Sequence, residues 1–438
     1  MKKLLIIAAL MMLATSAFAA VQNVKVSGDI TTYGVGQYIY DLDDDAGDAD
    51  VSSYTAGDEN NFFATITRLR VDADLTDNVA ATIRLSNERE WGEVGQENTD
   101  VNLDLAYITL KEIFYSPLTV MIGRQDLAYG STLVVGDPNT NANVAGDSDL
   151  DNAPYLSKAK SFDAIVGVLD YDPWTIDLLY AKISEIYEGS NDEDQDILGL
   201  NLAYDFADYE AETEAYVFFV DGDQATASED ITVLGLRGSL APADGLTIGA
   251  EIAIQTGDYS TTQDMDALAA TIEGSYVWDN EYSPMIKLCY DYRSGDNDTS
   301  AGDFDAWDPL YEDQTKGLIA DYLFEGVNGG VNSNAQIINL GGSFQPTEDL
   351  TIALDWFNYT LDEKLSSAPS TWNSGMASQS IKSTEDDLGN EIDLAIVYDY
   401  TEDVVIGLQA GWFMPGDVFE AANDDDAFAL VGSIAVSF

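Results

Sequence analysis

The sequence predicts an all-β protein, a transmembrane antiparallel up-and-down β-barrel of about 18 strands with short periplasmic turns and long external loops. Three observations predict this fold. Apolar and polar side chains alternate along most of the chain, short and long connections alternate between the segments, and the last segment is apolar and ends on an aromatic residue. Alternation with a period of two residues indicates strands whose two faces meet different environments.

Eighteen segments carry this alternation. Their approximate spans are 22–40, 60–75, 79–91, 100–112, 117–125, 160–171, 174–187, 195–206, 210–221, 230–241, 245–257, 267–279, 282–294, 335–345, 349–360, 388–400, 403–414 and 427–438. An even number of strands places both ends of the chain on the same side of a membrane, as is usual for bacterial barrels.

The connections between these segments differ systematically in length. Eight are tight turns, at 76–78, 114–116, 172–173, 207–209, 242–244, 280–281, 346–348 and 401–402. Nine mostly longer connections, acidic or rich in glycine, alternate with them at 41–59, 92–99, 126–159, 188–194, 222–229, 258–266, 295–334, 361–387 and 415–426. A soluble β-sandwich has no reason for such regular alternation, whereas an outer-membrane barrel has one. Loops 126–159 and 295–334 are both candidates to fold inward and set the pore size.

The alternation also assigns the two faces of each strand. In segment 60–75, Leu69 and Val71 share one side, while Arg68, Arg70 and Asp72 share the other. An arginine that faces lipid at mid-depth costs about 2–4 kcal/mol, so the charged side must face water. A barrel of about 16–18 strands is wide enough to enclose a water-filled lumen. Aromatic residues near strand ends on the apolar side are expected to form interfacial girdles: Trp91, Trp174, Trp278, Trp356, Trp412, Tyr204, Tyr292, Tyr398 and Tyr400.

The two ends of the chain predict its destination. Residues 1–19 have the basic start, short apolar run and small-residue site of a signal peptide, so cleavage is expected near Ala19. Residues 20–438 then form a single barrel domain in the outer membrane of a Gram-negative bacterium. The final strand, ending at Phe438, is typical of the signal that the barrel assembly machinery reads. That machinery, outer-membrane lipid and lipopolysaccharide are the expected partners.

Composition excludes several classes of function. The chain has no histidine, which rules out histidine-based catalytic triads and histidine–zinc sites. Its one cysteine, Cys289, cannot form an internal disulfide and reads as a wall residue. The formal net charge of −61 makes nucleic acid an improbable partner, because binding phosphate needs a basic surface. We therefore expect no enzymatic activity and no resident cofactor.

Charged residues on the predicted inner face are the candidates to line the pore. They are Arg68, Arg70, Asp72, Arg84, Glu88, Arg124, Arg237, Glu251, Lys287, Arg293, Glu391 and Asp393. Arg68, Arg70 and Arg84 lie on one hairpin, with Asp72, Asp74, Glu88 and Glu90 close by in sequence. Two interpretations stand side by side: an ion-pair ladder that stiffens the wall, or a transverse field at a constriction that sets selectivity.

Acidic rows favour cations in the predicted lumen. Glu210, Glu212 and Glu214 alternate along one strand, and Glu391, Asp393 and Asp399 along another. A wall with this excess of negative charge attracts cations. The external loop that carries Asp41, Asp43 and Asp45 also has acidic residues at alternate positions, as calcium loops do, although Ala46 stands where an EF-hand needs glycine. The two interpretations of this loop are a calcium site and a solvated acidic loop.

Two segments resemble the alginate export family of outer-membrane barrels. One is Ile122-Gly123-Arg124-Gln125-Asp126-Leu127-Ala128-Tyr129-Gly130; the other is Leu388-Gly389-Asn390-Glu391-Ile392-Asp393-Leu394, followed by Gly411-Trp412-Phe413-Met414-Pro415-Gly416-Asp417. The resemblance implies a monomeric barrel with the same number of strands that passes polysaccharide or small solutes. It also implies that Arg124, Glu391 and Asp393 belong to the lumen wall or its structural network. The family's namesakes guide an anionic polymer through an arginine-rich constriction, whereas this chain is acidic.

The leading functional hypothesis is a porin for passive passage of small solutes or ions, preferring cations or neutral solutes. The alternative is a pore for export of an alginate-like polysaccharide. A barrel enzyme and a structural barrel with a plugged lumen are the hypotheses from other classes; single-channel conductance separates them from the first two.

Overall fold

The computed structural model describes residues 23–43, 59–92, 101–138, 150, 152–188, 191–224, 227–297, 302–324, 330–365, 371–374, 377–421 and 423–438. The expected signal peptide, 1–19, lies outside the described residues. No helix in these ranges is both long and apolar enough to cross a membrane.

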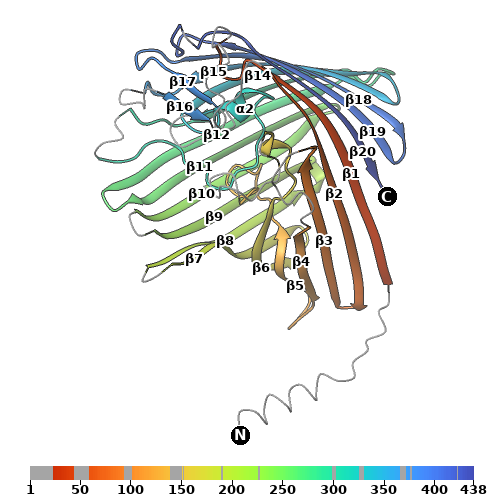
Figure 1. Cartoon of the computed structure of the whole chain (residues 1–438). Coiled ribbons are helices and arrows are strands. Elements are labelled where there is room, and N and C mark those ends of the chain that lie inside the picture. Colours follow the sequence, from red (N-terminus) through yellow and green to blue (C-terminus); the bar gives the residue numbers. More distant parts are fainter. Residues whose placement is uncertain are drawn as a thin grey trace.

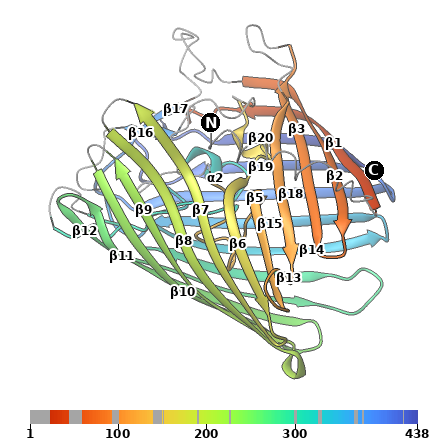
Figure 2. The ribbon, with the colours of Figure 1, turned by 90° about the horizontal axis from the view of Figure 1, so that it is seen from below.

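Eighteen antiparallel strands form one closed barrel, which confirms the predicted fold class (Figures 1 and 2). The ring closes because β1 pairs with β20 on one side and with β2 on the other. The barrel strands are β1 (Asn23–Tyr38), β2 (Glu59–Thr76), β3 (Val79–Glu90), β4 (Asn102–Lys111), β5 (Leu118–Asp126), β6 (Ser161–Asp170), β7 (Trp174–Glu188), β8 (Asn191–Phe206), β9 (Ala211–Gln224), β10 (Ala227–Ala243), β11 (Leu246–Ser260), β12 (Gln263–Val277), β13 (Met285–Arg293), β14 (Ala335–Thr347), β15 (Leu350–Leu361), β18 (Asp387–Thr401), β19 (Val404–Pro415) and β20 (Ala427–Ser437).

Within the described residues, five short elements lie outside the ring of strands. Strands β16 (Thr371–Ser374) and β17 (Ala377–Ser380) pair with each other as a separate hairpin, which the sequence pattern did not predict. The other elements are the single-turn helices η1 (Pro154–Leu156), η2 (Ala207–Tyr209) and α2 (Ala320–Leu323). Figures 1 and 2 both show α2 within the outline of the barrel.

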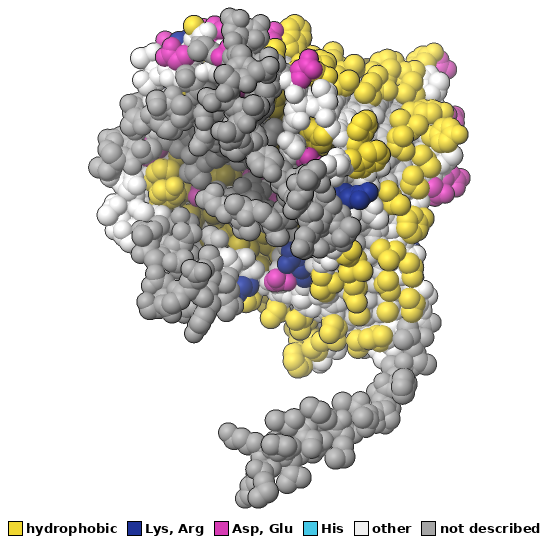
Figure 3. Space-filling model, in the orientation of Figure 1, with side chains coloured by type: hydrophobic (Ala, Val, Ile, Leu, Met, Phe, Trp, Pro, Cys, Tyr) yellow, Lys and Arg dark blue, Asp and Glu magenta, His cyan; other side chains and the backbone are white. Residues whose placement is uncertain are grey.

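The outer wall is apolar, as the alternation predicted. Leu69, Ile83 and Leu85 are all exposed, while Arg68 and Arg84 on the same strands point to the opposite face. Hydrophobic side chains cover much of the outer wall in Figure 3. All five predicted girdle tryptophans are exposed, Trp91 most of all at 52%. Lipid is the solvent that fits such a surface, because every backbone group of a closed barrel is already paired.

Three connections expected to be long are instead continuations of the strands. The β7–β8, β9–β10 and β11–β12 ladders extend through the expected loops, leaving only residues 189–190, 225–226 and 261–262 between paired positions. Acidic side chains suggested loops here, but antiparallel pairing uses backbone groups and continues in water whatever the side chains are. Glu210 is a second correction: it takes a left-handed conformation after η2, and β9 begins only at Ala211.

The inner face differs most from expectation, because much of it is apolar and covered. The described parts of both the β5–β6 loop (127–160) and the β13–β14 loop (294–334) pack against it. The larger inner core joins these loops to β6–β12 and includes Leu133, Val135, Trp307, Tyr311, Phe162, Phe218 and Ile231. The smaller inner core joins α2 to β14, β15 and β18–β20 and includes Ile319, Leu323, Phe324, Ile337, Tyr359 and Phe413. The inner face is therefore only partly polar, and the water-filled lumen that the alternation predicts stays a prediction.

Backbone pairing joins the two inner loops. Val135 forms a parallel bridge with Tyr311, and the Gly136 amide donates to the Tyr311 carbonyl over 2.7 Å. The Asp313 amide donates to the Thr132 carbonyl over 3.0 Å. The two loops thus form one inner body, which fixes where the charged wall residues find their partners.

Candidate functional site

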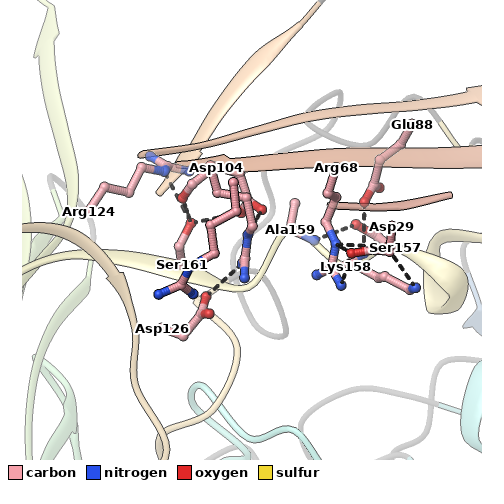
Figure 4. A network of polar contacts seen from close by, with 12 residues as sticks. Asp29, Arg68, Glu88, Asp104, Arg124, Asp126, Ser157, Lys158, Ala159 and Ser161 are labelled. Carbon is pink, nitrogen blue, oxygen red and sulfur yellow. Dashed lines mark hydrogen bonds and ion pairs between the residues drawn. The ribbon is translucent and has the colours of Figure 1, made fainter. Parts of the chain in front are cut away.

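A row of cations lies on the inner face, contributed by β2, β3, β5 and the end of the β5–β6 loop (Figure 4). The Arg68 guanidinium lies 3.0 Å from the Asp29 carboxylate, and the Lys158 ammonium lies 3.6 Å from the same carboxylate. Lys158 also donates to the hydroxyl of Thr31 over 3.1 Å. Arg68 on the wall and Lys158 on the loop therefore share one negative charge.

Arg84 and Arg124 continue this row. Arg84 forms ion pairs with Asp104 and with Asp126, the latter at 3.1 Å. Arg124 donates to the Ser161 hydroxyl over 3.2 Å and lies 3.5 Å from the Asp163 carboxylate. Beyond them, Lys160 pairs with Asp313 of the other inner loop. Arg68 contacts both oxygens of Asp29, the two-point geometry that fixes a guanidinium plane against a carboxylate.

The ion-pair partners differ from those expected from nearness in sequence. Arg70 does pair with Asp72, at 2.9 Å. Arg68 and Arg84 instead take Asp29, Asp104 and Asp126 from other strands, because strand register rather than sequence distance decides which side chains meet. Register also places Arg70 directly opposite Arg84.

Glu88 and Glu90 serve a different purpose: they hold the β5–β6 loop. Glu88 accepts a hydrogen bond from the Lys158 amide over 2.8 Å. Glu90 accepts one from the Asn152 amide over 2.8 Å and another from the Asn152 side chain. Both glutamates are buried. A carboxylate that accepts from backbone amides forms a charge-assisted bond, stronger than one between neutral groups.

Carboxylates across the barrel hold the other end of the same loop. Glu214 accepts from the Gly130 amide over 2.8 Å, and Glu251 accepts from the Ser131 amide over 2.9 Å. The hydroxyl of Tyr216 donates to the second Glu251 oxygen over 2.8 Å. The two contacts with the loop, from Gly130 and Ser131, join residues more than eighty positions apart in the chain.

Glu391 and Asp393 anchor the β13–β14 loop. Glu391 is fully buried and accepts from three consecutive amides, those of Leu318, Ile319 and Ala320, over 2.7–2.8 Å. Asp393 accepts from the Leu318 amide over 3.1 Å. The Tyr359 hydroxyl, which donates to the Lys316 carbonyl, lies 3.3 Å from Glu391. The start of α2 is thus tied to β18 by two acidic side chains.

The remaining cations of the candidate set are also paired. Arg237 lies 2.8 Å from Glu212, and Lys287 lies 2.7 Å from Asp355. Arg293 is buried, lies 3.6 Å from Asp291, and donates to the Gln314 side chain over 2.6 Å. Each residue of the candidate set thus has a protein partner in the structure, and its role in lining a pore stays a prediction.

No group of three or more acidic or cysteine side chains that would suit a metal ion occurs within the described ranges. In the proposed calcium loop the Asp43 amide donates to the Asp41 side chain over 3.4 Å, and Asp45 lies outside the described residues. Calcium binding at this loop stays a prediction.

Comparison with known proteins settles the family. The family model described as "Alginate export" matches residues 44–432. The chain belongs to the alginate export family. No curated protein sequence matches it. Solved structures with the same fold include OccD3 (OpdP) of Pseudomonas aeruginosa, at 13% identity and a TM-score of 0.56, covering 95% of this chain and 92% of that one. OccAB1 of Acinetobacter baumannii has 9% identity and a TM-score of 0.57, covering 95% and 97%. OccK2 (OpdF) of P. aeruginosa, solved with glucuronate, has 11% identity and a TM-score of 0.54, covering 95% and 99%.

The segments that carry the family resemblance have physical roles in this alginate export barrel. Gly123 and Gly389 both have strongly positive φ, and a Cβ on either would collide with a carbonyl of the neighbouring strand. Gln125 is buried and donates to the Ala164 carbonyl over 3.0 Å. Glu391 anchors α2, and Phe413 packs beside it in the smaller inner core. The first segment therefore leads into the β5–β6 loop, and the second contacts the β13–β14 loop.

Several functional residues of this family member escaped the sequence pattern. Lys158 and Lys160 extend the cation row from a loop, and Glu90 anchors that loop. Gln255 anchors the other loop, exchanging hydrogen bonds with the Asp308 backbone. Two lysines spaced by two residues just before a strand, in a chain so poor in cations, were the one available signal.

Proposed function

We propose that the protein is an outer-membrane channel for passive passage of small solutes, with a preference for cations. The observation that carries this proposal is the pairing of all seven arginines and lysines of the candidate set with carboxylates, at 4.0 Å or less. Paired cations exert little net field. The chain has 79 acidic against 18 basic residues, so the excess charge that a solute meets is negative. A low-dielectric wall focuses such a potential into the pore.

A measurement of ion selectivity tests this proposal. The purified barrel is inserted into planar bilayers under a potassium chloride gradient, and the reversal potential is recorded. A reversal potential with the same sign as the equilibrium potential of potassium supports a cation preference. A potential set by chloride contradicts it, and the absence of any conductance contradicts the channel itself.

Export of an acidic polysaccharide is the second candidate, favoured by family membership and by the row from Arg68 to Lys160. The complex of OccK2 with glucuronate shows that one barrel of this fold binds a uronate. Alginate oligomers added to the bilayer chamber discriminate the two candidates. Block of the current at micromolar oligomer supports the second candidate, while an unchanged current supports the first.

We also propose that the last strand is read by the barrel assembly machinery, and that the mature barrel lies among outer-membrane lipid and lipopolysaccharide. The Phe438 amide donates to the Gly28 carbonyl over 3.0 Å, and the Gly28 amide donates back over 2.9 Å. The Phe438 ring is 62% exposed beside this seam. An exposed ring beside the closing seam is accessible to a partner.

Replacing Phe438 tests the proposed partner. Phe438→Ser is expected to lower the yield of folded barrel severalfold in vesicles that contain the assembly machinery. Phe428→Ser, at the other end of β20, is the matched control and should fold normally. Equal losses for Phe438→Ser in pure detergent, where no machinery is present, would show that the ring serves only the seam.

A further inference from the structure

A second polar site lies on β7–β9, the part of the wall that follows the cation row along the ring of strands, beneath the β5–β6 loop. Its floor is formed by Asp177 of β7 and Asn201 of β8, which are directly opposed in the strand register. Glu214 of β9 borders it, two residues before Tyr216, the register partner of Asn201. Tyr129 and Gly130 of the loop cover it: the Gly130 amide donates to Glu214 over 2.8 Å, and the Tyr129 ring packs on Phe218.

Two oxygen atoms of this site, one on Asn201 and one on Asp177, have no donor among the described residues. Asn201 is only 5% exposed, yet its side-chain oxygen has no hydrogen-bond partner among the described residues. The same holds for the Asp177 oxygen Oδ1, which is buried. Leaving a buried acceptor without a donor costs about 1–3 kcal/mol, so two such atoms side by side indicate a group that is brought in from outside.

The charge at the site is negative. No ion pair to Asp177 is found within the part of the chain that the structure describes, and the Arg237 guanidinium, 4.0 Å from Glu214, lies closer to Glu212, at 2.8 Å. Burial raises the pKa of the Tyr129 hydroxyl, and the charges of Asp177 and Glu214 raise it further, which places both carboxylates near that ring. Arg237 is thus shared between two carboxylates, those of Glu212 and Glu214.

We propose that Asp177, Asn201 and Glu214 form a binding site for the primary ammonium group of a solute. An ammonium group carries three N–H donors and no acceptor, which matches an oxygen of each of these three side chains. A calcium ion fits less well because it takes about 6–8 oxygen ligands. This inference rests on the proposed channel function and names its solute class: small amines that cross the barrel along the wall of β7–β9.

Ligand-observed NMR tests the site without needing a current. Saturation-transfer titrations of butylammonium with the purified barrel in detergent give an apparent dissociation constant, and tetramethylammonium, which has the same charge but no N–H donor, serves as the comparison. Asp177→Asn is expected to weaken butylammonium binding by about tenfold, since it removes a charged hydrogen-bond partner. Asn201→Leu should weaken it as well. Heat-modified migration on gels verifies that each variant is folded.

Glu273→Gln is the matched control. It removes one charge from an exposed inner-face position of β12, away from the proposed site, and should change binding less than about twofold. Equal weakening by Glu273→Gln and Asp177→Asn, or equal binding of tetramethylammonium, would overturn the site in favour of diffuse attraction. Because binding is read in micelles, a chloride-selective reversal potential refutes the proposed function separately, whether or not the amine binds.

Discussion

At the scale of single residues, Glu312 is the group that couples the inner loops to pH. Its carboxyl group lies in the β13–β14 loop, outside the membrane-spanning strands, and is 7% exposed. Burial raises its pKa from 4.5 to about 7, although the Gln314 amide and the charge of Arg293 oppose the shift. A raised pKa means that the packed loop binds the proton more tightly than the released loop does.

The sign of the pH dependence follows from this shift. The contribution of Glu312 to loop packing is complete below about pH 4.5 and is lost as the pH rises through about 7. Transitions of the single-channel current to larger substates should therefore become roughly tenfold more frequent between pH 5 and pH 8. Glu312→Gln should remove this dependence. If Glu312→Gln kept the full pH dependence of these transitions, another group would be responsible for it.

Residue faces were predictable from the sequence, whereas residue partners were not. Arg68 and Arg84 were assigned correctly to the inner side, because the pleat of a strand alternates its side chains. Their partners Asp29 and Asp104 come from other strands, and Glu251 meets Ser131 over 120 positions of chain. Such contacts depend on how loops fold back into the barrel, and no periodic pattern encodes that path.

At the scale of elements, α2 and the residues before it are held mainly by Glu391. Glu391→Gln removes the charge that three amides share and places an N–H donor beside one of them. Leaving a buried amide without its acceptor costs about 1–3 kcal/mol, so release of this segment should become about tenfold more frequent. Trypsin cleavage after Lys316 should accelerate by that factor.

Two comparisons make the trypsin experiment specific. Cleavage after Lys158, in the loop that Glu88 holds, should keep its wild-type rate in Glu391→Gln. Glu402→Gln, in an exposed tight turn, should leave both sites unchanged. If Glu391→Gln accelerated cleavage equally at Lys316 and Lys158, general loosening of the barrel rather than loss of one anchor would explain the result.

The strands themselves were well predicted because one face of each must satisfy lipid. Strand ends beyond the membrane were not, as the extended β7–β8 and β9–β10 ladders show. Beyond the membrane both faces of a strand meet water, so the alternation of apolar and polar side chains is lost. Backbone pairing between the strands continues there. The β16–β17 hairpin, only four residues per strand, is too short to produce a periodic signal.

At the scale of the whole molecule, the barrel has the apolar outer wall of a membrane protein and an interior that is partly filled by packed apolar side chains. The larger inner core contains fully buried side chains such as Trp307 and Tyr311 from one loop and Phe162 and Phe218 from the wall. Apolar wall residues and acidic anchors both hold the inner loops. Many carboxylates on the inner face therefore hold the inner loops in place and also contribute to the negative potential of the pore.

The central claim is that the two inner loops, packed on the barrel wall, set the open area of the channel. Single-channel conductance tests it most directly, comparing the wild type with a variant whose residues 302–324 are replaced by a short glycine–serine linker. Removing this segment should raise the conductance by about twofold or more, because an 18-stranded barrel encloses a much wider lumen. An unchanged conductance in a variant that still folds as a barrel would contradict the claim.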